Sequence, residues 1–361
     1  MYTSKEKLCI LLGEYGLSSK KFFEFVDVVN DFDNPLADTD SAKIREILGT
    51  LYAPVAAAFR NNAVNGIMSD MKANGVVAVT WFSEDYPACL RDISEPPFVL
   101  FCRGDVTLLN SRCLSVVGTR KASSYGRRVA ADFTKVLAEY FVIVSGLAYG
   151  IDSIAHEATL AEKGKTVAVL GSGVSNVYPS ANERLAERIV ENGGLVLSEY
   201  GLRAQPLTYR FPHRNRIVAG LSQGVLVCQA PLKSGTNSTV ELALEQGRDV
   251  FAVPGEVYDA GFAGSNRLIK SMQGACVTTP RDIIDYYGLD CRKESKQTVQ
   301  LSFEEQRIVD VLTEGPKNFD SLITETSLTP SELNFLLANL ELRSIIARLP
   351  GNTYRLYGGI E

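Results

Sequence analysis

The sequence of 361 residues is poor in the groupings that build metal sites and disulfide frameworks. It has only two histidines, His156 and His213, and none of its seven cysteines forms a C-x-x-C pair. We therefore expect no metal site, because zinc needs a cluster of such ligands. The seven cysteines are scattered, and scattered cysteines in a chain without an export signal are typical of reduced thiols in a cytosolic protein.

Long apolar runs are also missing. No stretch reaches the ~18–20 apolar residues that span a bilayer, and the N-terminal MYTSKEKLCILLGEYG has no small-residue cleavage site. We expect neither a membrane-spanning helix nor a signal peptide. Hydrophobic residues make up 45% and charged residues 22% of the chain, the profile of a soluble globular protein. This length indicates two or three domains.

The net charge of −5 conceals two stretches that contain no acidic residue. The first, 106–131, contains Arg112, Arg120, Lys121, Arg127 and Arg128. The second, 200–240, contains Arg203, Arg210, Arg214, Arg216 and Lys233. If the fold brings them together, they form an electrostatic footprint for a polyanion. The alternative is ordinary solvated surface charge, and most of the acidic excess lies in 1–70 and 302–361.

The spacing of apolar residues predicts a helical domain over 1–70 and an α/β domain over 71–288. In the second domain, short β-rich runs alternate with helical patterns. These runs are apolar on consecutive positions, as in parallel strands buried on both faces. We therefore predict a doubly wound, mostly parallel sheet. Its expected strands are two within 76–104, then CLSVVG, FVIVSG, TVAVLG, LVLSE, GVLVCQ, DVFAVPG and ACVTT.

The C-terminal part is predicted to be a winged helix over 302–361, joined by a polar linker at 289–301. Three helices are followed by a hairpin around PGN, and Thr329 and Pro330 open the third helix. That helix has Glu332 and Glu341 but no basic residue before its end. A helix that reads duplex DNA needs Arg or Lys, so we expect a protein contact or a structural role.

Small residues follow several expected strands, at the edge where open α/β sheets bind ligands. GTR at 118–120 would let a phosphate approach the backbone, with Arg120 as a forked donor; the alternative is an ordinary turn. GSG at 171–173 lacks the third glycine of a dinucleotide fingerprint and follows a later strand. We favour a tight turn without a nicotinamide cofactor, whose amides could hold one phosphate.

Two groups of residues have a catalytic interpretation and a structural alternative. Ser145, Asp152 and His156 do not fit the nucleophile-elbow spacing, so we expect Asp152 and His156 to pack or cap. SGTNSTVE at 234–241 resembles the PGGxGTxxE loop of nucleotide phosphoribohydrolases, with Glu241 as the carboxylate. It lacks PGG, so we favour an anion-binding loop and keep a nucleotide N-glycosidase as the alternative.

The heptapeptide RFPHRNR at 210–216 gathers three arginines, a histidine and a phenylalanine. Arginines anchor phosphates, and an aromatic ring is a stacking platform worth ~1–3 kcal/mol per base. Because Pro212 restricts the residue before it, we predict that Phe211 is extended in a loop. Local sequence leaves open whether Phe211 is a platform or part of the core.

Nine motifs, in one order, resemble the DNA-processing protein DprA (Smf) family over roughly residues 72–285. They are YPACLRDISEPPFVLFCRGD, SVVGTRKASSYGRR, VSGLAYGIDSIAHEATL, TVAVLGSGVSNVYPSAN, LSEYG, FPHRNRIVAGLS, KSG, LALEQGRDVFAVPG and GSNRLIK. The resemblance implies an extended Rossmann-like domain at 71–288. The flanking parts are similar to the family's N-terminal helical (SAM-like) and C-terminal winged-helix modules.

The same resemblance implies a non-enzymatic cytosolic protein without a cofactor that binds single-stranded DNA. Such proteins protect incoming strands during natural transformation, load the RecA recombinase and form homodimers through the Rossmann-like domain. By motif, Arg120 would grip a phosphate, Phe211 would stack on a base and Asn266 would close the groove. The implied DNA-binding residues are Arg120, Lys121, Ser145, Gly146, Gly171, Ser172, Gly173, Phe211, Arg214, Asn215, Arg216, Lys233, Ser234, Gly235, Thr236 and Asn266. A nucleotide-binding regulator is a third, more general alternative.

Overall fold

A computed structural model describes residues 2–33, 35–36, 41–289, 301–343, 345–349 and 351–356. The chain forms two compact units, Met1–Asp290 and Cys291–Glu361. Most of the expected linker at 289–301 lies outside the described residues. None of the described helices is long and apolar enough to cross a membrane.

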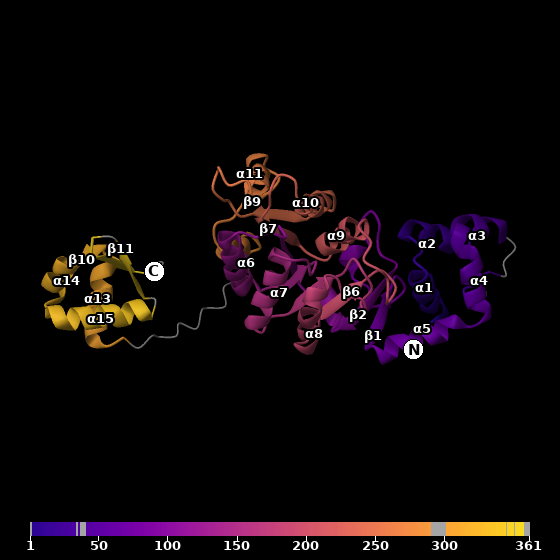
Figure 1. The fold of residues 1–361 in the computed structure, drawn as a ribbon, viewed down its shortest axis with the longest axis horizontal. Coiled ribbons are helices and arrows are strands. Elements are labelled where there is room, and N and C mark those ends of the chain that lie inside the picture. Colours follow the sequence, from indigo (N-terminus) through magenta and orange to yellow (C-terminus); the bar gives the residue numbers. More distant parts are fainter. Residues whose placement is uncertain are drawn as a thin grey trace. The chain divides into compact units, whose positions relative to one another are not determined.

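The first unit contains a nine-stranded sheet in the order β1-β2-β6-β5-β4-β3-β7-β8-β9 (Figure 1). Its strands are β1 (Val76–Thr80), β2 (Val99–Gly104), β3 (Cys113–Gly118), β4 (Val142–Ser145), β5 (Thr166–Val169), β6 (Leu195–Ser198), β7 (Gly224–Gln229), β8 (Asp249–Ala252) and β9 (Ala275–Cys276). From β6 to β9 all neighbouring strands are parallel, whereas β1 and β2 pair antiparallel. The predicted mostly parallel α/β sheet is confirmed.

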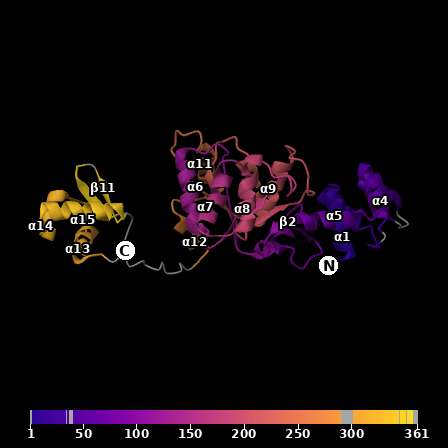
Figure 2. The same ribbon diagram turned by 60° about the horizontal axis from the view of Figure 1, so that its bottom comes forward.

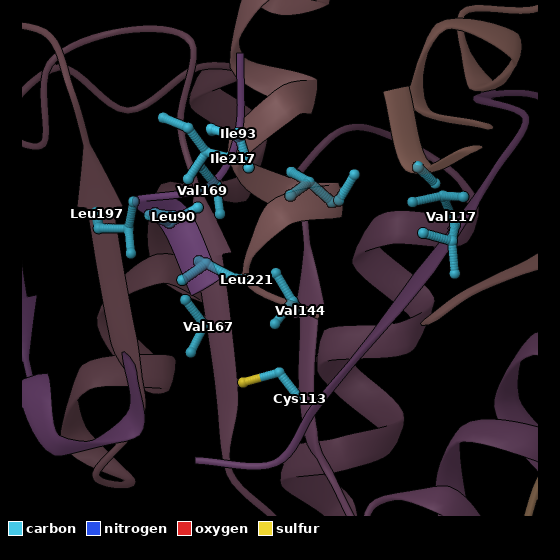
Figure 3. Close-up of a cluster of buried hydrophobic side chains, with 14 of the residues drawn as sticks. Leu90, Ile93, Cys113, Val117, Val144, Val167, Val169, Leu197, Ile217 and Leu221 are labelled. Carbon is cyan, nitrogen blue, oxygen red and sulfur yellow. The ribbon is translucent and has the colours of Figure 1, made fainter. Parts of the chain in front are cut away.

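Helices cover both faces of this sheet, which is why its strands are apolar on consecutive positions. Their bounds are α6 (Ser124–Leu137), α7 (Ile151–Ala161), α8 (Glu183–Glu191), α9 (Arg210–Gly220), α10 (Thr236–Glu245), α11 (Ala263–Lys270) and α12 (Pro280–Tyr286). Helices α6, α7 and α8 lie side by side in chain order on one face (Figures 1 and 2). On the other face, Ile217 of α9 and Leu221, the residue after this helix, pack on Val144, Val167 and Val169 of the sheet (Figure 3).

The N-terminal helices pack against β1 and β2 (Figures 1 and 2). They are α1 (Ser4–Glu14), α2 (Ser19–Val26), α3 (Ser41–Leu48), α4 (Tyr52–Arg60) and α5 (Ala63–Ala73). Side chains of β2 alternate between faces, so Val99 and Phe101 join the core of these helices while Leu100 and Cys102 join the core beneath α9. The helices and the sheet therefore share one continuous unit.

The second unit is a winged helix, as predicted. Its elements are α13 (Phe303–Thr313), β10 (Lys317–Asn318), α14 (Phe319–Thr326), α15 (Pro330–Leu342), β11 (Ile346–Leu349) and β12 (Thr353–Leu356). Thr329 caps α15 through a capping box with Glu332, and Pro330 begins the helix. Leu333, Leu337 and Leu340 bury one stripe of this helix.

The heptapeptide RFPHRNR forms the beginning of helix α9, so the predicted loop is wrong. Pro212 is the third residue of the helix. In the first turn a backbone N–H has no intrahelical acceptor, so the N–H that proline lacks costs nothing there. A residue before proline usually prefers an extended backbone. Phe211 is nevertheless helical, because Pro212 is accommodated in the first turn of α9.

Candidate functional site

The sheet order creates a crevice between the loops that follow β3 and β7. These strands are neighbours, but the chain leaves β3 towards β4 on one side and reaches β8 from β7 on the other. Such a reversal of strand order leaves room for a ligand beyond the carboxyl ends of the strands. A pocket of about 670 Å³ lies there. The expected site residues that line it are Arg120, Lys121, Gly146, Phe211, Arg214, Asn215, Lys233, Ser234, Gly235 and Thr236.

The mouth of the pocket is positively charged. Arg120 and Lys121 follow β3, Lys233 follows β7, and all three side chains are exposed. Among the described lining residues the one carboxylate is Asp152, which is buried. An anionic ligand would therefore meet cations first.

The two acid-free stretches contribute fewer free cations than their sequences suggested. Arg112 directly precedes β3 and so lies at the opposite edge of the sheet from the pocket. Arg203 forms an ion pair with Asp70, and the Arg210 Nη1 donates to the carbonyl of Gln205. These three arginines are not among the residues that line the pocket.

Arg214 lines the pocket but is only 4% exposed, and the protein uses most of its donors. It donates to the carbonyl oxygens of Gly146, at 2.7 Å, and Val169, which ties α9 to the ends of β4 and β5. Burial lowers the pKa of Arg214 to about 10, and Asp152 opposes that shift. Arg214 therefore remains a cation near neutral pH.

Arg216 is 3% exposed and lies away from the pocket. Its two terminal nitrogens donate to the two carboxylate oxygens of Glu199, each at 2.6 Å. Burial would raise the pKa of Glu199, but Arg216 and His213 outweigh it and lower that pKa to about 2. Sequence reasoning missed Glu199, whose one signal is its place between the end of β6 and the acid-free stretch.

The ring of Phe211 is half-buried at the pocket wall, between core and surface. It packs against Gly171, where an added Cβ would lie 2.8 Å from the ring. Tyr178, which the sequence analysis did not select, lies 5.4 Å from it between ring centroids and is 45% exposed. The Arg120 guanidinium lies 6.0 Å from the ring centroid. One part of the ring is thus supported while another faces the pocket.

Several expected site residues are occupied by internal contacts. Gly171, Ser172 and Gly173 are buried, the hydroxyl of Ser145 donates to the Val116 carbonyl at 2.7 Å, and Asn266 exchanges two hydrogen bonds of 3.1 Å with the backbone of Gly255. None of these five is among the lining residues of the pocket.

Gly235 differs from the other glycines of the site because it faces open space. Nothing lies within 4 Å of a Cβ added there. It is the residue before α10 and follows Lys233 and Ser234. The first two amides of this helix donate to Ser234, that of Thr236 to the hydroxyl at 3.2 Å and that of Asn237 to the carbonyl at 3.1 Å. The positive end of the helix dipole beside the exposed Lys233 suits an anion such as a phosphate.

The residues of the catalytic interpretations have separate partners. Asp152 accepts from the amides of Gly146 and Ala148, at 3.2 and 3.3 Å, whereas His156 Nδ1 lies 2.7 Å from the hydroxyl of Thr166. Burial raises the pKa of Asp152 and lowers that of His156 to about 3. Glu241 lines a different, smaller pocket of about 340 Å³ between α10 and α11.

Comparison with known proteins agrees with this arrangement. The family model described as DNA recombination-mediator protein A matches residues 77–288. The chain belongs to this family. A model described as the DprA winged helix domain matches residues 292–352, so the resemblance to the DprA (Smf) family is confirmed.

Relatives in this DprA family cover most of the chain. Protein Smf of Escherichia coli K12 is 40% identical over 285 residues, 76% of each chain. DNA processing protein DprA of Streptococcus pneumoniae R6 is 46% identical over 200 residues, 55% of this chain and 70% of the relative. The X-ray structure of DprA from Streptococcus pneumoniae matches with a TM-score of 0.64 and 34% identity, over 79% of this chain and 98% of that one.

A second solved structure, of DNA processing protein A from Helicobacter pylori, is described by its unique single-stranded DNA binding mode. It matches with a TM-score of 0.54 and 30% identity, over 59% of this chain and 95% of that chain. The two structures together support the fold of the sheet unit.

Proposed function

We propose that this chain binds single-stranded DNA in the pocket beyond the carboxyl ends of β3 and β7 and acts as a recombination mediator. The observation that carries the proposal is the pocket that combines exposed Arg120, Lys121 and Lys233 with the half-exposed ring of Phe211. Cations hold phosphates, and an aromatic platform accepts any unpaired base. The description of the Helicobacter pylori relative as a single-stranded DNA binder supports it.

The same geometry favours a single strand over a duplex. Phe211 lies inside a pocket rather than on a ridge, so a base must leave its stack to reach the ring. A duplex pays for that unpairing, whereas a single strand does not. The Gly235 turn and Lys233 would hold the neighbouring phosphate.

The test is a salt-titrated binding comparison of oligo-dT with a blunt duplex of equal length. The logarithm of affinity should fall with the logarithm of salt by about 0.7 per phosphate contacted. Lys233→Ala should flatten this slope by about one contact, because Lys233 is exposed at the pocket mouth. Arg112→Ala, which removes an exposed cation at the other edge of the sheet, is the matched control and should leave the slope unchanged. Equal affinity for duplex and single strand would overturn the proposal.

We also propose the finer roles that the family resemblance implies: protection of incoming strands, loading of RecA and a homodimer formed by the Rossmann-like domain, in the cytoplasm. Nuclease protection of bound oligonucleotide, RecA filament growth on coated strands and sedimentation of the full chain test these roles separately.

We propose that binding, rather than catalysis, is the function of the site. Glu241 lines the small pocket between α10 and α11, away from the Gly235 turn and its lysine. Incubation with nucleoside monophosphates should therefore release no free base at high protein concentration. Base release that Glu241→Gln abolishes would contradict this.

A further inference from the structure

We infer that the N-terminal helices hold the base-stacking wall of the pocket, formed by Phe211, Gly171 and Tyr178, in its binding geometry. Glu14 and Asp70 are the positioning residues, and they act through the loop between β6 and α9. The inference rests on the proposed single-stranded DNA binding. It gives the N-terminal helices a role in that binding, although none of their described residues lines the pocket.

The first contact is made by Glu14, the last residue of α1. Its carboxylate Oε2 accepts a hydrogen bond of 2.8 Å from the backbone N–H of Leu202. The preceding residue must be small, because a Cβ on Gly201 would lie 2.7 Å from the same oxygen. The Leu202 side chain is buried in the apolar core of the N-terminal helices. The loop is thus held by a charged acceptor and an apolar anchor at one point.

The second contact lies one residue further along the loop. Arg203 makes a two-pronged ion pair with Asp70 of α5, at 2.5 and 3.0 Å. Exposed ion pairs contribute little alone, but this one fixes the direction of the loop after Leu202. Residues 201–203 are therefore tied, one after another, to α1 and α5.

The opposite side of the loop is bonded to the turn that follows β5. The N–H of Ser175 donates to the carbonyl of Leu202, and the N–H of Gly173 donates to that of Ala204, each at 2.9 Å. This turn contains Gly171, against which the Phe211 ring packs, and leads to Tyr178 beside the ring. The loop is therefore hydrogen-bonded directly to the turn that supports the Phe211 ring.

The loop also leads directly into the ring itself. It ends at Tyr209, the residue before α9, and Phe211 is the second residue of that helix. The supporting turn is thus bonded to Leu202, which Glu14 holds, and the ring follows Arg203, which Asp70 holds, on the same stretch of chain. A platform held in its binding geometry loses less free energy on ordering when a base arrives.

The experiment uses the full chain and two strands of equal length, oligo-dT and its abasic counterpart. Glu14→Ala should weaken binding of oligo-dT by about tenfold, the scale of one hydrogen bond to a charged group. Binding of the abasic strand and the salt slope should not change, because the phosphate contacts remain. Glu14→Gln keeps an oxygen acceptor for Leu202 and should largely restore affinity. Asp70→Ala should also weaken the binding of oligo-dT, but by less than Glu14→Ala.

Two controls separate positioning from loss of structure. Glu24→Ala removes an exposed carboxylate from α2 and should change neither affinity. In a Phe211→Ala background, Glu14→Ala should have no further effect on oligo-dT, because the platform it positions is gone.

The outcomes distinguish this inference from the proposed function. Equal weakening of both strands by Glu14→Ala, or no weakening of either, would overturn the positioning role. If the wild-type chain binds neither strand in a salt-dependent way, the proposed single-stranded DNA binding itself fails.

Discussion

At the scale of single residues, the arginines of one heptapeptide serve different purposes. Arg214 joins α9 to the ends of two strands while touching the pocket, and Arg216 neutralises the buried Glu199. Their spacing alone could not separate these uses, because the acceptors come from distant parts of the chain. Among the described residues that line the pocket, the exposed cations are Arg120, Lys121 and Lys233, on loops after β3 and β7.

Removal of the Arg216 guanidinium should destabilise the fold, because it leaves the buried Glu199 carboxylate without its main partner. We expect Arg216→Ala to lower the free energy of unfolding in urea by about 3–5 kcal/mol. The matched control is Arg281→Ala, which removes an exposed ion pair with Asp285 and should cost at most about 1 kcal/mol. A loss for Arg216→Ala no larger than the control would contradict the assigned role.

Truncation of the Phe211 ring should act on bases rather than on phosphates. Phe211→Ala should weaken oligo-dT binding by about 1–3 kcal/mol, the free energy of base stacking, and leave the salt slope nearly unchanged. Phe211→Tyr keeps a ring and should retain most of the affinity. A steep change in slope for Phe211→Ala would show that the ring instead organises the cations.

His213 should make stability depend on pH. Hydrogen bonding to Glu199 raises the pKa of His213 although burial and Arg216 lower it, and Glu95 adds a further hydrogen bond while Tyr200 contacts the ring. A raised folded-state pKa gives stability that is complete below the unfolded value of about 6.5 and is lost as pH rises through the folded value. The Tm should therefore fall above about pH 6.5, and His213→Asn should remove that part of the dependence. An unaltered profile in this variant would assign the dependence to other groups.

At the scale of elements, strands were easier to predict than the segments that join them. The run GVLVCQ corresponds to β7 residue for residue. A parallel strand buried on both faces needs apolar residues at consecutive positions, and this pattern is visible in the sequence. RFPHRNR was predicted as a loop but forms the start of α9. Proline is tolerated there because a backbone N–H in the first turn of a helix has no intrahelical acceptor.

The glycines of the strand-end turns show the same limit. The sequence suggested that small residues there admit a phosphate. Gly146 and Gly171 instead admit protein atoms, from Arg214 and Phe211 respectively, while Gly235 faces open space. The partners of Gly146 and Gly171 lie 68 and 40 residues away in the chain, so no local pattern could reveal them.

Alanine should therefore impair base binding at Gly171 and have no effect on it at Gly235. Gly171→Ala should displace the Phe211 ring and weaken binding of oligo-dT more than binding of an abasic strand. Gly235→Ala should leave stability and base discrimination unchanged, because its Cβ meets nothing and its φ of −61° suits any residue. Binding of the two strands measures base discrimination, and unfolding in urea measures stability. Equal behaviour of the two variants would refute the packing explanation.

At the scale of the whole molecule, the family resemblance predicted the fold, and the sheet order explains where its site lies. The basic residues were recognised from sequence as a possible footprint, but their convergence depends on β3 and β7 being neighbours. The winged-helix unit was also predicted, and its α15 exposes Glu332 and Phe335.

Because α15 exposes Glu332 and Glu341, we expect the winged-helix unit to contribute little to the binding of duplex DNA. A chain ending at residue 301 should therefore bind oligo-dT and duplex with affinities equal to those of the full chain. Gel-shift titration of both chains measures this. A selective loss of duplex binding on removal of 302–361 would contradict the expectation drawn from the acidic residues of α15.

The way the large sheet ends has a consequence for solution behaviour. At one end, β1 lies beneath the N-terminal helices, with which Val76 and Ala78 share a core; at the other, β9 has only two residues. Unpaired strand edges are the usual template on which sheets of different molecules join. Here the N–H of Ala78 on the outer edge of β1 donates to the hydroxyl of Tyr2 at 2.7 Å, and β9 offers only two residues. The native sheet therefore presents little free edge for pairing with a second molecule, and the concentrated protein should resist the slow growth of β-rich aggregates.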